Sequence, residues 1–196
     1  MFKENITSEE LNELPLKMFE GEIMVVDTLK KIHEAVNILS KETIIGFDTE
    51  TKPAFKKGVI NHVALLQLSI DKKAFLFRIS KTGLPEILTN ILSSPDIIKS
   101  GVAIHDDIKS LQHISPFEPS GFIELQDAVK ECGIADFSLK KMAGIILGIR
   151  ISKSQRLSNW ETANLSEAQQ RYAATDAWVS YKIYKALKRN IERLEY

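Results

Sequence analysis

Two carboxylates stand two residues apart at the end of a short apolar segment. Asp48 and Glu50 follow the run TIIGF, which is typical of a buried strand. Because side chains alternate along a strand, both carboxylates lie on the same face. Neighbouring carboxylates in a buried setting raise each other's pKa and cost free energy unless a cation joins them. The pair therefore indicates either a metal site or a polar turn that ends the strand.

A third carboxylate lies on a predicted helix over residues 166–193, which begins with the capping pair Ser166 and Gln169. Asp176 falls on the apolar stripe of this helix, and Tyr172, one turn earlier, projects beside it. A charged residue on an apolar face is costly unless it is paired. Asp176 is therefore a candidate metal ligand or the partner of an arginine elsewhere in the fold. The predicted inward stripe consists of Ala168, Tyr172, Val179, Ile183 and Leu187.

Two more acids follow a predicted strand in the segment SGVAIHDDIKSL. Asp106 and Asp107 come directly after that strand, and the residue pattern alone leaves both open as ligands. The acids at strand ends and on the helix can meet at one edge of a sheet. Carboxylate oxygens of this kind favour Mg²⁺ or Mn²⁺ over zinc. The sequence therefore predicts a divalent-metal site.

The elements that position these acids form three antiparallel strands followed by strands that alternate with helices. This order predicts an α/β fold with a mixed sheet flanked by helices. The expected strands cover residues 22–27, 43–50, 63–70, 73–79, 97–104 and 122–126. The expected helices follow the caps Thr28, Ser138 and Ser166 or lie near residues 84–92 and 106–113, and the one after Ser138 stops near Gly148.

Length and composition indicate one globular domain. The chain has 196 residues, of which 44% are hydrophobic and 27% charged. We expect an acidic N-terminal extension over residues 1–21 and the functional domain over residues 22–196. Cys132 is the only cysteine, which excludes an intrachain disulfide framework and a cysteine zinc site. No signal-peptide pattern and no membrane-length apolar run occur, so we expect a cytoplasmic protein.

The charge distribution leaves room for a nucleic-acid partner although the net charge is zero. Residues 137–160 contain no acid, and their basic residues are Lys140, Lys141, Arg150, Lys153 and Arg156. A phosphate backbone needs a local basic surface rather than a basic protein. A set of solvated lysines and arginines is the other interpretation of this stretch.

Three segments resemble, in order, the three motifs of the DEDD superfamily of 3′→5′ exonucleases: FDTET, GVAIHDDIKSL and YAATD. The spacing of Tyr172 and Asp176 places the chain in the tyrosine branch of that superfamily. The runs VALLQLS and KSQRLSNWE are similar to segments of Werner-type exonucleases and ribonuclease D. The resemblance covers about residues 22–190 and favours Asp107 as the second-motif ligand, by its spacing from Gly101 and Leu111.

The resemblance implies a ribonuclease H-like fold and removal of nucleotides from a single-stranded 3′ end of DNA or RNA, with release of nucleoside 5′-monophosphates. It implies two divalent metal ions, Mg²⁺ or Mn²⁺, held by Asp48, Glu50 and Asp176, with Asp107 acting through water. Tyr172 is expected to orient the attacking water. Substrate contacts are expected from Thr49, Lys153 and Arg156. A non-catalytic binding module on the same fold is the main alternative, but such a module usually lacks one of the acids.

Overall fold

A computed structural model describes residues 2–53 and 61–194. Its centre is a six-stranded sheet in the order β1-β4-β3-β2-β5-β6. β2, β3 and β4 are antiparallel, whereas β5 and β6 run parallel to β2, which confirms the predicted mixed sheet. The strands are β1 (Glu22–Val26), β2 (Ile44–Thr51), β3 (Val63–Ser69), β4 (Lys73–Phe77), β5 (Ile98–Gly101) and β6 (Phe122–Glu124).

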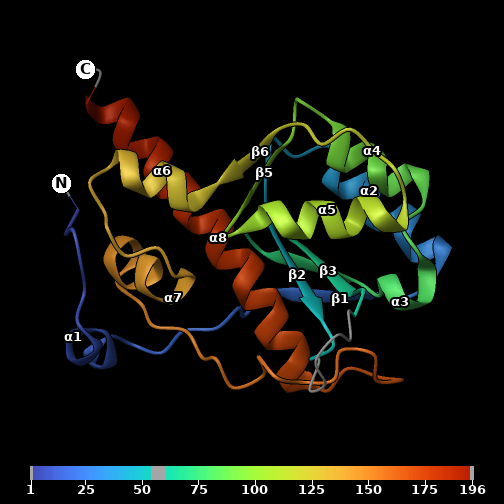
Figure 1. Ribbon diagram of the computed structural model, residues 1–196, viewed down its shortest axis with the longest axis horizontal. Coiled ribbons are helices and arrows are strands. Elements are labelled where there is room, and N and C mark those ends of the chain that lie inside the picture. Colours follow the sequence, from blue (N-terminus) through green and yellow to red (C-terminus); the bar gives the residue numbers. More distant parts are fainter. Residues whose placement is uncertain (1, 54–60, 195–196) are drawn as a thin grey trace.

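Helices cover both faces of the sheet, and the longest, α8, crosses one face diagonally (Figure 1). α2, α4 and α5 close a large apolar core on the other face. α6 and α7 pack near the C-terminal half of α8. The helices are α1 (Ser8–Glu13), α2 (Leu29–Leu39), α3 (Ile79–Thr82), α4 (Glu86–Ser93), α5 (Ile104–Ile114), α6 (Leu125–Glu131), α7 (Leu139–Met142), the π-helical turn η1 (Ala143–Leu147) and α8 (Glu167–Leu194).

The predicted helix starts are confirmed. Thr28 and Ser138 accept the backbone N–H groups of Lys31 and Lys141. Ser166 and Gln169 satisfy each other's backbone N–H groups at the start of α8. Each of these caps is a contact between residues three apart, which is why the local sequence is enough to predict it.

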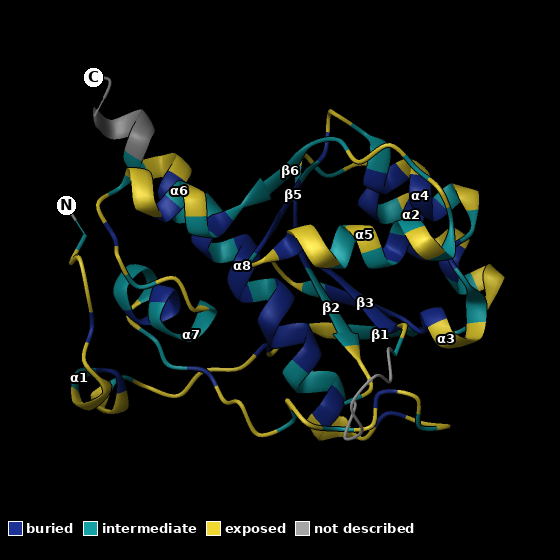
Figure 2. Ribbon diagram, in the orientation of Figure 1, coloured by how far each residue is buried: buried dark blue, intermediate teal, exposed yellow. Residues whose placement is uncertain are grey.

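Several local predictions are wrong. The strands expected over residues 73–79 and 122–126 end at Phe77 and Glu124, because α3 begins at Ile79 and α6 begins at Leu125. The strand expected over residues 97–104 ends at Gly101, because the chain turns at Ala103, which has a φ of 56°, and begins α5 at Ile104. The stripe predicted for α8 includes Ala168, but this residue is exposed, because it lies in the first turn, outside the part of the helix that crosses the sheet. In the middle of α8, residues outside the predicted stripe are buried as well, and buried residues are dark blue in Figure 2.

The N-terminal segment, residues 2–21, packs along the body of the protein. Ile6 donates its backbone N–H to Asp136, and Phe19, which is fully buried, donates its backbone N–H to the Thr175 hydroxyl on α8. Leu16 forms an isolated parallel bridge with Arg150. The division of the chain at residue 22 stays a prediction. Among the described residues, no helix is long and apolar enough to cross a membrane.

Candidate active site

β2 carries Asp48 and Glu50 to an open end of the sheet. β5 pairs with β2 only as far as Gly46, so the following residues of β2 extend past the end of β5. Gly46, Asp48 and Glu50 alternate with Phe47, which is buried in the apolar core on the opposite face of the sheet from α8. The two carboxylates therefore face α8, on the same side of the sheet, as the sequence predicts.

α8 brings the third carboxylate to this pair. Oxygen atoms of Asp48, Glu50 and Asp176 lie within 4.8 Å of one another. Asp176 is only 8% exposed. The helix lies very close to the strand, since a methyl group at Gly46 would stand 1.8 Å from the carbonyl oxygen of Ala177. The separation of the carboxylates is therefore set by direct contact between two backbones.

The N-terminal turn of α5 brings in Asp107 and turns Asp106 away. The Thr49 hydroxyl donates to the Asp107 carboxylate at 2.6 Å. The Asp106 side chain is 94% exposed and lies beside His105. The turn itself is fixed by Glu124, whose carboxylate accepts the backbone N–H groups of Ala103 and Ile104.

The pKa values of all four carboxylates are raised. Burial, and then the charges of Asp176, Glu50 and Asp107, raise the pKa of Asp48 well above its usual range. Burial, and then the charges of Asp176 and Asp107, raise the pKa of Glu50 to about 8. Burial raises the pKa of Asp107 to about 6 and that of Asp176 to about 7. A cluster of buried hard oxygen donors with uncompensated charge is the donor set that a divalent cation such as Mg²⁺ or Mn²⁺ needs.

Tyr172 stands beside the cluster as a hydrogen-bond donor. Its hydroxyl interacts with Asp176 and favours the charged form of that carboxylate. Burial, and then the charges of Asp176, Glu50 and Asp48, raise the pKa of Tyr172 well above its usual range. Its ring packs against the fully buried Trp160, with 6.0 Å between the ring centroids. The phenol therefore keeps its proton at neutral pH and can donate but not act as a base.

The predicted substrate contacts have different surroundings. Lys153 lies near enough to Asp176 for its charge to lower the pKa of that carboxyl. Arg156 is exposed on the same loop. Thr49 uses its hydroxyl on Asp107, so a contact between this side chain and a substrate stays a prediction. Two other basic residues of the stretch have structural partners, since Lys141 pairs with Asp136 and Arg150 donates to the carbonyl of Leu14.

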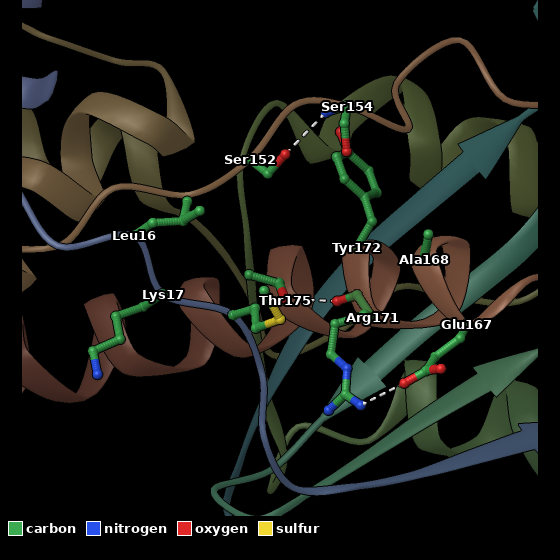
Figure 3. A pocket seen from close by; sticks show the side chains of 10 residues that line it. Leu16, Lys17, Ser152, Ser154, Glu167, Ala168, Arg171, Tyr172 and Thr175 are labelled. Carbon is green, nitrogen blue, oxygen red and sulfur yellow. Dashed lines mark hydrogen bonds and ion pairs between the residues drawn. The ribbon is translucent and has the colours of Figure 1, made fainter.

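A cavity of about 430 Å³ adjoins Tyr172 on α8 (Figure 3). Its walls come from α8, from the loop that precedes α8 and from the N-terminal segment. Local sequence patterns do not predict that the N-terminal segment lines this cavity, because the contact joins residues about 150 positions apart, such as Phe19 and Thr175. The lining residues are Leu16, Lys17, Met18, Ser152, Ser154, Glu167, Ala168, Arg171, Tyr172 and Thr175.

Gln67 also lies beside the carboxylates and is not among the site residues predicted from the sequence. It lies on β3 directly opposite Asp48. Its side chain is fully buried. The available signal was a glutamine inside the otherwise apolar run VALLQL.

Comparison with known proteins finds similarity over most of the chain. A family model described as 3′-5′ exonuclease matches residues 23–192. The Mus musculus bifunctional 3′-5′ exonuclease/ATP-dependent helicase WRN is 36% identical over 156 residues, which cover 76% of this chain and 11% of that protein. The chain thus spans a small part of the length of that relative.

Solved structures share the fold. The Aedes aegypti Nibbler EXO domain superposes with a TM-score of 0.81 at 24% identity, covering 92% of this chain and 93% of that one. Escherichia coli RNase D, described as an exoribonuclease involved in structured RNA processing, superposes with a TM-score of 0.79 at 22% identity, covering 88% of this chain and 46% of that one.

Proposed function

Since the chain belongs to the 3′-5′ exonuclease family, we propose that it removes nucleotides one at a time from the 3′ end of DNA or RNA with two divalent ions, Mg²⁺ or Mn²⁺. The observation that carries this proposal is the convergence of Asp48, Glu50 and Asp176 within 4.8 Å. Asp107 stands next to this group through its hydrogen bond with Thr49. A binding module that had lost its chemistry would have no reason to retain four clustered acids, of which Asp176 is buried and the other three are half-buried.

Asp48, Glu50 and Asp176 would hold the ions, with Asp107 beside them. When bound, a pair of divalent ions lowers the pKa of the attacking water and neutralises the charge on the attacking and leaving oxygens. The raised pKa values of Glu50, Asp107 and Asp176 describe the protein without this positive charge. A nearby cation favours the charged carboxylates, so binding of the ions and full ionisation of the acids support each other.

The chain's own side chains orient the reacting groups. The Tyr172 hydroxyl, beside Asp176, can donate a hydrogen bond that fixes the water that attacks the phosphorus. Lys153, whose charge reaches Asp176, can pair with the phosphate next to the broken bond. The exposed Arg156 can contact the next phosphate of the strand. Hydrolysis at the 3′ end then releases a nucleoside 5′-monophosphate and leaves a strand one residue shorter.

A direct assay tests the proposal. The protein is incubated with 5′-labelled single-stranded DNA, recessed duplex DNA and single-stranded RNA, each with Mg²⁺, Mn²⁺ or EDTA. We expect a ladder that shortens in one-nucleotide steps in the presence of metal and no change in EDTA. Intact strands in every metal condition would contradict the proposal. The relative rates on the three substrates decide between DNA and RNA.

The cytoplasmic location expected from the sequence remains a proposal. Fractionation of cells that produce the protein, followed by detection of the protein in each fraction, tests it.

A further inference from the structure

Gln67 is a fully buried amide to which the described structure gives no hydrogen-bond partner at either polar atom. It lies on β3, a strand in which every residue is buried. A buried polar group without a partner costs about 1–3 kcal/mol, so such groups are rare in native proteins. An amide at this position therefore needs a reason beyond packing.

Ser69 provides a comparison on the same strand and the same face. It is also fully buried, but its hydroxyl donates to the carbonyl of Ile70 at 3.1 Å. Ser69 lies opposite Gly46, whereas Gln67 lies opposite Asp48. Of the two buried polar residues on this face of β3, the one without a hydrogen-bond partner is also the one that faces a carboxylate of the candidate metal site.

The geometry of the ladder brings the Gln67 amide to Asp48. Residues directly opposite each other in an antiparallel pair have Cβ atoms about 4.5–5.5 Å apart, with both side chains on one face. The backbone N–H of Thr49 donates to Oδ1 of Asp48 at 2.9 Å. A carboxylate has about four lone-pair positions, so Asp48 retains acceptor capacity for the amide N–H groups of Gln67.

A second buried group without a partner belongs to the apolar cluster that borders Gln67 on β4. Leu76 on β4 stands opposite Gln67 and belongs to the same apolar cluster as Trp160. The indole Nε1 of Trp160 is buried and has no partner among the described residues. An indole N–H can only donate, and the oxygen of a glutamine amide can only accept. Gln67 thus stands opposite a carboxylate on β2 and, on β4, opposite a residue of the cluster that contains a donor without an acceptor.

We propose that Gln67 is the positioning residue of Asp48, with its amide oxygen accepting from the Trp160 indole and its amide N–H donating to the Asp48 carboxylate. The inference rests on the proposed function, because the contact matters most when Asp48 is ionised and holds a divalent cation. A donor behind a metal-binding carboxylate fixes its orientation, and loss of such a partner typically lowers metal affinity or activity by about 10–100-fold.

The matched variants Gln67→Met and Ser69→Ala test the proposal through metal binding. Methionine has nearly the shape of glutamine but no hydrogen-bonding amide. We expect Gln67→Met to bind Mn²⁺ about 10–100-fold more weakly in isothermal titration calorimetry. Its unfolding temperature in EDTA should fall slightly, because the buried Trp160 indole loses the acceptor proposed for it. Ser69→Ala should also unfold at a lower temperature, but it should bind Mn²⁺ with wild-type affinity.

The outcomes separate this inference from the proposed function. If the wild-type protein binds no Mn²⁺ and degrades no strand, the proposed function fails and this inference fails with it. If the wild type binds Mn²⁺ and folded Gln67→Met binds it equally well, the proposed function stands and the role of Gln67 is overturned.

A measurement on the unchanged protein covers the case in which Gln67→Met does not fold. The side-chain amide signals of Gln67 are followed by ¹H–¹⁵N NMR as Mg²⁺ is added, with those of Gln126 as the control. The Gln126 amide donates to the carbonyl of Phe137, away from the carboxylates. We expect the Gln67 amide protons to move downfield while Gln126 stays unchanged. Gln67 signals that do not move while Mg²⁺ binds would overturn the proposal.

Discussion

Two buried charged sites share this sheet, and they differ in what surrounds the charge. On β5 the Lys99 ammonium donates to the carbonyls of Ser94 and Ile97 at 2.6 and 2.7 Å and lies 5.1 Å from the centre of the Phe122 ring. At the end of β2, by contrast, Asp48, Glu50 and Asp176 lie mainly against one another. Burial lowers the pKa of Lys99 to about 8, while burial and neighbouring charge raise that of Glu50 to about 8.

The difference shows how a structural charge can be told from a functional one. The fold itself supplies acceptors to Lys99, so that the residue is complete within the chain. The carboxylates have only partial compensation, from Lys153 and the Tyr172 hydroxyl on Asp176 and from the two Thr49 hydrogen bonds to Asp48 and Asp107. When the chain does not compensate the charges of clustered acids, a bound cation is needed to neutralise them and to stabilise their ionised forms.

The largest effect is expected from a substitution in the acidic site. Asp176→Asn removes one repelling charge and one metal ligand but keeps the shape of the side chain. Loss of a single proton-handling group typically lowers turnover by about 10²–10⁴-fold, and we expect the loss of this metal ligand to lower nuclease turnover further. In EDTA the unfolding free energy should rise by about 1 kcal/mol or more, because one pKa unit corresponds to about 1.4 kcal/mol. Activity assays and chemical denaturation measure the two changes.

The matched control for that variant is Ser180→Ala, one turn further along α8. The Ser180 hydroxyl is buried and donates to the backbone carbonyl of Asp176. This variant should lose stability and keep turnover within about twofold, since its bond is to the backbone alone. An Asp176→Asn protein that is less stable in EDTA than the wild type would show that the acids do not repel one another in the way described.

The next effect concerns Tyr172, the neutral donor of the acidic site. Tyr172→Phe keeps the ring that packs on Trp160 and removes only the hydroxyl. Turnover should fall by about 10²–10⁴-fold with nearly unchanged Mn²⁺ and substrate affinity, the pattern of an interaction made mainly in the transition state. Steady-state kinetics and calorimetry separate these quantities. Full turnover in this variant would exclude a role of the hydroxyl in orienting water.

A smaller effect distinguishes the two acids of α5. Asp107→Asn changes a carboxylate that accepts from Thr49, and we expect a loss of turnover of about 10–100-fold. Asp106→Asn changes a side chain that is 94% exposed, and turnover should stay within about twofold. The same DNA or RNA ladder assay serves for both variants. The reverse order of effects would mean that Asp106 is the residue that acts at the site.

The smallest effect is a pH dependence with opposite signs for the two sites in metal-free protein. The folded-state pKa of Glu50 is raised, so its contribution to stability is complete below about pH 4.5 and is lost as the pH rises through about 8. The folded-state pKa of Lys99 is lowered, so its contribution is present above pH 10.5 and is lost as the pH falls through about 8. Stability should therefore fall between pH 4.5 and 8 and rise between pH 8 and 10.5.

Lys99→Met is the control for the upper half of that profile. Methionine carries no charge at any pH, so the rise above pH 8 should shrink, by about 1 kcal/mol or more, while the fall below pH 8 remains. Urea denaturation in EDTA across this range measures both slopes. A profile of Lys99→Met that matches the wild type above pH 8 would show that Lys99 does not titrate in this range.

The sequence was most informative where neighbours along the chain decide the structure. The alternation of Asp48 and Glu50 on a strand places both on one face whatever the rest of the fold does. The end of β5 could not be predicted from local sequence. It depends on the Glu124 carboxylate, about 20 residues later, which accepts the backbone N–H groups of Ala103 and Ile104. The parallel pairing of β1 with β4 likewise joins segments about 50 residues apart, and nothing local to residues 22–26 specifies it.

The same limit explains what was missed at the candidate site. Gln67 looked like one polar residue in an apolar strand until the register of β2 and β3 placed it opposite Asp48. The choice between Asp106 and Asp107 needed the orientation of α5, since adjacent residues on a helix point about 100° apart. Residue type and spacing identified the acids, whereas their partners came only with the tertiary structure.

The close approach of Gly46 to Ala177 has a consequence for how this protein tolerates mutation. A methyl group at Gly46 would stand 1.8 Å from a backbone oxygen, so no rotamer change can relieve the clash and α8 must move away from β2. The large core residues, such as Phe75, can exchange for other apolar side chains with local repacking. In a library of single substitutions, the smallest residue of β2 should therefore accept fewer replacements than the largest residues of the core.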